Sequence, residues 1–173
     1  MCRMNLFQRI AFIFLLCGLA ITPAAFAQNI PVAQDAYFSP ATATNFGSTA
    51  NLNVGGPKGN QAVVQFDLSS LPAGTTGANV AKATLVLFVN RVTAAGNVNF
   101  SLANGGWKES TLTGTGSYPV SGLSIATAVP VATAGEFVSV DATQAVQDWL
   151  NGGCGQRRHP DQSGCRGAGG VRQ

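Results

Sequence analysis

Two neighbouring segments with strand patterns constrain the fold of this chain more than any other feature. Residues 62–68, AVVQFDL, alternate in hydrophobicity, which predicts a strand buried on one face only. Residues 71–74, LPAG, have the composition of a turn. Residues 82–89, KATLVLFV, are continuously apolar after their first residues and fit a central strand buried on both faces. A strand, a turn and a second strand in close succession predict a β-sheet protein.

Further short strands are predicted along the chain, separated by turns rich in Gly and Pro. They cover residues 33–38, 51–54, 98–102, 125–131 and 137–140. Strands at such short spacing are typical of two packed sheets. We therefore predict an all-β fold, a two-sheet antiparallel β-sandwich that is jelly-roll-like.

The hydrophobic period changes to that of a helix near residues 143–150. Asp141 or Thr143 can cap this short helix. Its apolar positions fall on one face and are Ala145, Val146, Trp149 and Leu150. We expect one short helix, packed through this face.

Residues 1–27 have the pattern of a secretory signal peptide. Arg3 and Arg9 precede the apolar stretch 10–21, and Ala25 to Ala27 form a small-x-small cleavage site. A transmembrane anchor is the alternative, but the stretch is shorter than the roughly 20 residues that a spanning helix needs. We expect cleavage after Ala27 and a secreted, extracellular bacterial protein that does not span the membrane in its mature form.

The charge of the body of the chain argues against nucleic-acid binding. The formal charge of the full sequence is +3, but residues 28–150 hold four Lys and Arg against six Asp and Glu. The basic surplus lies in the signal peptide and the tail. No basic stripe is left in the body to neutralise phosphates.

The body also lacks the side chains of nucleophilic catalysis. Residues 28–150 contain no His and no Cys, which excludes Ser/His/Asp and Cys/His arrangements there. A zinc site formed by Cys154, His159 and Cys165 would have irregular spacing and no fourth ligand. Paired carboxylates remain an alternative, from Asp35, Glu109, Asp141 and Asp148. We predict that the chain is not an enzyme.

Several short motifs follow one another along the chain: DAY at 35–37, NFGS at 45–48, LNVG at 52–55, QFDLSSLPAG at 65–74, KATLVLFV at 82–89, WKEST at 107–111 and SVDATQAVQDWLNG at 139–152. In this order and spacing they resemble the DNRLRE domain, also called carbohydrate-binding module family 96, which is similar to the disaggregatase-related repeats. The resemblance covers residues 28–152. It implies a β-sandwich accessory module of secreted proteins that binds alginate-type acidic polysaccharide in some members.

The tail, residues 153–173, departs from this family pattern. Family members continue into another apolar strand, whereas this tail has no run of β-forming residues and holds two Cys, four Arg and the only His. We hypothesise a frameshifted reading in which the last strand is missing. A natural disordered tail is the alternative.

Aromatic and basic side chains are the candidates for sugar binding, because rings stack on pyranose faces and cations pair with acidic groups. They are Trp107, Tyr118, Lys108 and Arg91. The alternative for Trp107 is a core plug that closes one end of the sandwich. We predict a module that binds an acidic, alginate-like polysaccharide of the cell surface or matrix. The rival class is a structural or adhesive module without a sugar ligand.

Asp35 and Asp141 are candidate ligands of a structural Ca²⁺ ion. Calcium prefers carboxylate and carbonyl oxygens, and a body without disulfides would gain stability from an ion. Both residues fall on matched positions of the family motifs. In the alternative interpretation, Asp141 caps the helix and Asp35 is solvated or bonds a turn.

Overall fold

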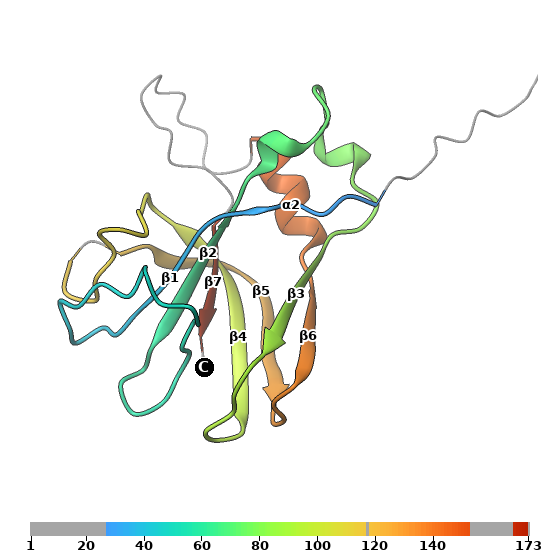
Figure 1. Cartoon of the computed structure of the whole chain (residues 1–173). Helices are drawn as coiled ribbons and strands as arrows, with labels where there is room; N and C mark the ends of the chain where they lie inside the picture. Colours follow the sequence, from blue (N-terminus) through green and yellow to red (C-terminus); the bar gives the residue numbers. More distant parts are fainter. Residues whose placement is uncertain (1–26, 117, 153–167, 173) are drawn as a thin grey trace, which may run out of the picture.

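The computed structural model describes residues 27–116, 118–152 and 168–172, and shows two antiparallel sheets (Figure 1). Five strands pair in the order β1-β2-β7-β4-β5, and two pair as β3-β6. The strands are β1 (Val32–Phe38), β2 (Gln61–Phe66), β3 (Thr84–Val89), β4 (Gly96–Asn104), β5 (Val120–Val131), β6 (Glu136–Asp141) and β7 (Ala168–Arg172). The predicted all-β sandwich is confirmed.

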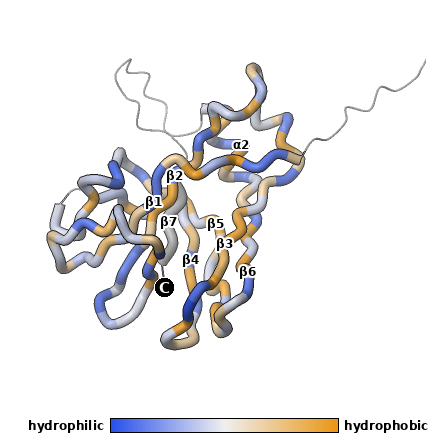
Figure 2. The backbone as a smooth tube through the Cα atoms, viewed as in Figure 1, coloured by the Kyte–Doolittle hydropathy of each residue, from blue (hydrophilic) through white to orange (hydrophobic). Residues whose placement is uncertain are grey.

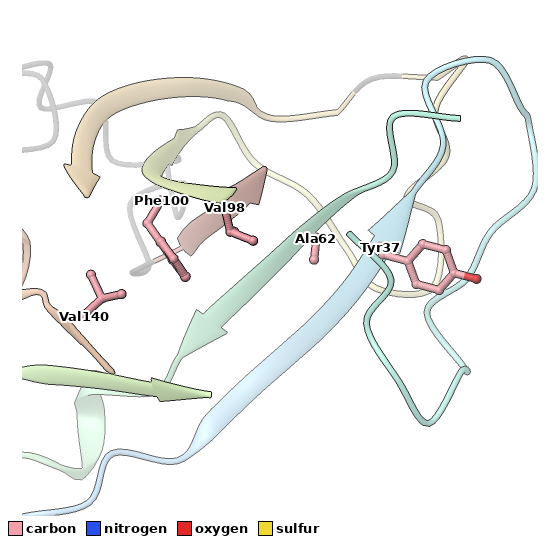
Figure 3. Packing of buried hydrophobic residues seen from close by; sticks show 5 residues of the cluster. All are labelled: Tyr37, Ala62, Val98, Phe100 and Val140. Carbon is pink, nitrogen blue, oxygen red and sulfur yellow. The ribbon is translucent and has the colours of Figure 1, made fainter. Parts of the chain in front are cut away.

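The main core lies between the two sheets. Its buried residues come from both sheets and are Tyr37, Ala62, Val98, Phe100 and Val140 (Figure 3). Leu85, Leu87 and Val138 of the β3-β6 pair pack against them. Burial of this apolar surface holds the two sheets together.

A second core lies on the opposite face of the five-stranded sheet. Its buried residues are Ala36, Phe38, Val63 and Leu112. In the sheet register Ala36 pairs with Val63, whereas Tyr37 pairs with Ala62 of the main core. Since neighbouring residues of a strand point to opposite faces, β1 and β2 contribute to both cores.

The burial of β2 and β3 is the reverse of the prediction. Residues 62–65 of β2 are all buried. In β3, by contrast, exposed and half-buried residues alternate. The physical reason is the loop after β4, which covers one face of the five-stranded sheet. No comparable segment, among the described residues, shields the outer face of β3.

Residues 51–54 do not form the strand that we predicted. Only an isolated bridge follows them, between Gly55 and Asn60. Leu52 and Val54 nevertheless pack against the main core. The apolar alternation of this segment therefore reports burial of a loop rather than sheet pairing.

The helix is confirmed as α2 (Thr143–Leu150). It begins directly after β6, where Asp141 Oδ1 accepts a hydrogen bond from the backbone N–H of Thr143 at 2.9 Å. The helix packs against η2 (Gly77–Asn79), and Gln147 Nε2 donates to the carbonyl of Val80 at 2.8 Å.

The end of the chain contains a strand that we did not expect. The backbone of β7 lies between β2 and β4 and pairs with both in antiparallel register. Neighbouring ladders on both sides satisfy its backbone N–H and C=O groups whatever the side-chain pattern. Residues 153–167 lie outside the described residues, so the frameshift hypothesis stays a prediction.

Within the described ranges, no helix is both long and apolar enough to cross a membrane. Nearly all of the predicted signal peptide, residues 1–27, lies outside those ranges.

Candidate functional site

The loop that follows β4 carries three of the four predicted sugar-binding residues. We call residues 105–116 and 118–119 the covering loop, because they lie over the second core. Its WKEST segment forms a turn in which the N–H groups of Thr111 and Leu112 donate to the carbonyl of Lys108, at 3.1 and 2.9 Å. The turn fixes Trp107 on the core side and leaves Lys108 exposed.

A second loop, after β1, clamps the covering loop. Asn45 Nδ2 donates to the carbonyls of Glu109 at 2.7 Å and Leu112 at 2.9 Å. A Cβ atom on Gly47 would overlap the backbone oxygen of Glu109, and one on Gly114 would overlap that of Ser39. The two loops therefore touch backbone to backbone, at contacts that only glycine permits.

Glu109 is held through its backbone in a second way. Its N–H donates to Gln34 Oε1 at 3.0 Å, and Gln34 Nε2 donates to Gln65 Oε1 at 3.0 Å. These bonds connect the covering loop to β1 and β2. The WKEST motif therefore has a structural explanation that requires no ligand.

The two aromatic residues of the covering loop pack inward. Trp107 and Tyr118 are half-buried against the second core. The ring of Tyr118 lies 4.7 Å from that of Phe38, measured between centroids. The indole Nε1 of Trp107 is buried and has no hydrogen-bond partner among the described residues. This packing favours the core-plug interpretation of Trp107.

Arg91 lies at the other end of the sandwich. It follows β3 in the turn that leads into β4, whereas the covering loop begins where β4 ends. The nine residues of β4 separate the two places by about 27 Å. The structure therefore brings Trp107, Tyr118 and Lys108 into one loop but does not bring Arg91 to them.

Asp35 and Asp141 do not converge on a shared site. Asp35 pairs with Val64 in the five-stranded sheet, on the face of Tyr37 and the main core. Asp141 pairs with Thr84 and shares the exposed outer face of the β3-β6 pair. Among the described residues no three His, Cys, Asp or Glu side chains come together. The structure therefore places the two aspartates on different sheets and does not bring them to one site.

The carboxylate of Asp141 instead organises the junction between β6 and α2. Hydrogen bonds from the Thr143 side chain, then from the Thr143 backbone, and the positive charge of Lys82 hold the pKa of Asp141 below its ordinary value. Thr143 Oγ1 in turn accepts a hydrogen bond from the backbone N–H of Ala83 at 3.0 Å. This supports the alternative in which Asp141 stabilises the start of the helix.

An exposed apolar surface lies on the outer face of the β3-β6 pair, and sequence reasoning did not identify it. We call Val86, Phe88 and Phe137 the ribbon face; their side chains are 52%, 58% and 69% exposed. Hydrophobic residues run along both strands in Figure 2. The polar residues Thr84, Ser139 and Asp141 share this face and are the signal that could have identified it. Residues 85–89 are all apolar and by themselves carry no sign of which face is exposed.

Comparison with known proteins gives one family. The family model of carbohydrate-binding module family 96 matches residues 27–157, which is more than half of the chain. No curated protein matches the sequence. The matched segment spans β1 to α2 and contains the covering loop, both cores and the ribbon face.

Proposed function

Because this chain belongs to carbohydrate-binding module family 96, we propose that it is a secreted, non-catalytic protein that binds an acidic polysaccharide of the cell surface or matrix. The family match over residues 27–157 is the observation that carries the proposal. An alginate-type uronate polymer is the ligand that we favour.

The arrangement of polar groups supports binding rather than catalysis. Among the described residues, no three His, Cys, Asp or Glu side chains gather at one place. Asp35, Glu109 and Asp141 lie on different elements, in the five-stranded sheet, the covering loop and the β3-β6 pair. Asp141 is engaged with Thr143, and the backbone of Glu109 with Gln34 and Asn45. These contacts are those of folding.

The exposed cations support an acidic ligand. Lys108 is exposed on the covering loop, and Arg91 is exposed after β3. Each can pair with a uronate carboxylate at the surface, where such pairs contribute little individually and are screened by salt. An extended polymer can touch both ends of the sandwich, whereas a single sugar cannot.

Affinity electrophoresis of the full secreted protein tests the proposal. Native gels contain alginate, polygalacturonate or a neutral β-glucan, and a gel without polymer gives the reference mobility. We expect the uronate polymers to retard the protein. This retardation should weaken at 0.5 M salt, which is about three times the physiological ionic strength. Folded protein that migrates unchanged in every gel would contradict the proposed function and favour a structural or adhesive module.

A further inference from the structure

The ribbon face combines two features that are unusual for a solvent-exposed sheet. An antiparallel sheet with one wet face normally carries polar residues on that face. Here Phe88 and Phe137 stand opposite each other in the register, with ring centroids 5.1 Å apart and ring planes tilted by 56°. Each ring limits the rotation of the other. The two rings therefore form an ordered apolar surface even without a ligand.

The area of the ribbon face limits what can cover it. At exposures of 58% and 69%, the two phenylalanines together with Val86 offer roughly 300 Å² of apolar surface. A stable protein–protein interface takes about 800 Å² from each partner. The apolar surface of the ribbon face supplies less than half of that area, whereas it matches the face of one or two sugar rings.

Polar groups border this apolar surface on the same side of the strands. Ser139 pairs with Val86, and Asp141 pairs with Thr84 at the next position along the strands. From Thr84 to Phe88 the strip is about 13 Å long. It offers hydroxyl and carboxylate partners at one end and apolar rings at the other, which is how sugar sites combine stacking with hydrogen bonds.

A cation lies close to the aromatic end of the strip. Arg91 follows Phe88 by three residues, just beyond the end of β3, and is exposed. At the same end Glu136 is exposed and pairs with Val89, and at the far end Asp141 lies near the positive charge of Lys82. Each end of the strip therefore offers one cation, Arg91 or Lys82, that can pair with the carboxylate of a uronate.

We propose that the ribbon face is a carbohydrate-contact surface, on which the apolar face of a pyranose ring stacks against Phe88 and Phe137. The inference rests on the proposed function. It places the sugar on the outer sheet face, whereas the sequence pointed to the covering loop. Arg91 then belongs to this surface, while Trp107 and Tyr118 belong to the second core.

Titration calorimetry with an alginate hexamer tests this surface. The variants are Phe88→Ala and Phe137→Ala in the full protein, and the matched control is Leu123→Ala. Leu123 is 61% exposed on β5, outside the ribbon face. We expect each Phe variant to lower the affinity about tenfold, and the control to stay within about twofold of the wild type. The melting temperatures show whether each variant is folded.

Phe137→Trp gives a second readout that does not depend on loss of binding. An indole at this exposed position should retain stacking and shift its emission to shorter wavelength when the hexamer is added. Absence of a shift at saturating hexamer would place the sugar elsewhere.

The outcomes separate the two proposals. If the wild type binds neither the hexamer nor the polymers, the proposed function fails and this inference fails with it. If the wild type binds and both Phe→Ala variants bind equally well, only the ribbon face is excluded. A loss confined to Lys108→Ala would then move the site to the covering loop. If the Phe variants instead abolish a concentration-dependent dimer, the ribbon face contacts a second copy and the inference is wrong.

Discussion

The side-chain amide of Asn45 lies 2.7 Å from the backbone carbonyl of Glu109, although 64 residues separate them in the sequence. The same amide donates to Leu112 at 2.9 Å, and the side-chain oxygen of Asn45 accepts from the N–H of Gly47 at 3.2 Å. One side chain thus connects the loop after β1 to the covering loop. This connection closes the second core.

Replacement of Asn45 by Ala should destabilise the fold without loss of any apolar contact. Two backbone carbonyls lose their partner, at about 1 kcal/mol each, so we expect about 2 kcal/mol less free energy of unfolding. Urea unfolding followed by circular dichroism measures it. Asn53→Ala is the control, because Asn53 is exposed and its side chain makes no hydrogen bond within the described residues. Equal stability of the two variants would show that the clamp contributes nothing.

Gly47→Ala should lower the free energy of unfolding by more than the addition of one methyl group normally does. The added methyl group would collide with the backbone of Glu109, so the two loops must separate. We expect a loss of at least about 2 kcal/mol, typical of overpacking at a rigid contact. Gly106→Ala serves as the matched control, since nothing lies within 4 Å of a Cβ atom there. The measurement is the urea concentration at the unfolding midpoint of each variant. A Gly47→Ala variant as stable as Gly106→Ala would refute the close approach of the two loops.

The sequence predicted the architecture because most of its strands are bounded by strong turn signals. β4 extends a predicted strand by two residues at each end and β6 extends one by a single residue at each end, while α2 begins and ends at the predicted residues. Burial was harder to predict. Whether a face of β2 or β3 meets solvent depends on where the covering loop lies. That position is set by Asn45 and Gly47, which contact Glu109 although it lies more than 60 residues further along the sequence.

The candidate site shows the same limit more strongly. Trp107 and Lys108 are adjacent in sequence, so their common loop was predictable. The distance between them and Arg91 depends on the direction of β4, which residue types do not encode. Phe88 and Phe137 become neighbours only through the pairing of β3 with β6. The apolar run 85–89 has no polar position to mark the exposed side of Phe88. For Phe137 the signal was present, because Val138 and Val140 alternate with Ser139 and Asp141.

Trp107 should respond to mutation as a core residue. Trp107→Ala leaves a void over the second core, and we expect a loss of about 3 kcal/mol in the free energy of unfolding. Trp107→Phe should stay within about 1 kcal/mol of the wild type, because the indole N–H that it removes is buried without a partner. Denaturant unfolding measures both. A stable Trp107→Ala variant that no longer binds alginate would instead make Trp107 a ligand-binding residue.

Calcium removal should leave the stability unchanged. Asp35 and Asp141 lie on different sheets and face different directions, so the two carboxylates do not face a common ion. We expect the same melting temperature in 5 mM EDTA, roughly a hundredfold excess over protein, as in 5 mM calcium, since an ion that binds only the native state would raise it. A calcium-dependent rise that Asp35→Asn abolishes would show that the ion binds after all.

Acidification should weaken the junction between β6 and α2. Because the pKa of Asp141 is lowered in the folded protein by its bonds to Thr143 and by Lys82, the ionised carboxylate favours the native state. This contribution is fully present above the unfolded-state pKa, near 3.8, and is lost as the pH falls through the lower folded-state pKa. The melting temperature of Asp141→Asn should therefore lie furthest below that of the wild type at neutral pH, and the gap should close as the pH falls through the folded-state pKa. Thr143→Val, which removes the side-chain hydrogen bond, should reduce the pH dependence, and Thr143→Ser should restore it. A gap between Asp141→Asn and wild type that is constant from pH 7 to pH 2 would mean that the carboxylate charge does not stabilise this junction.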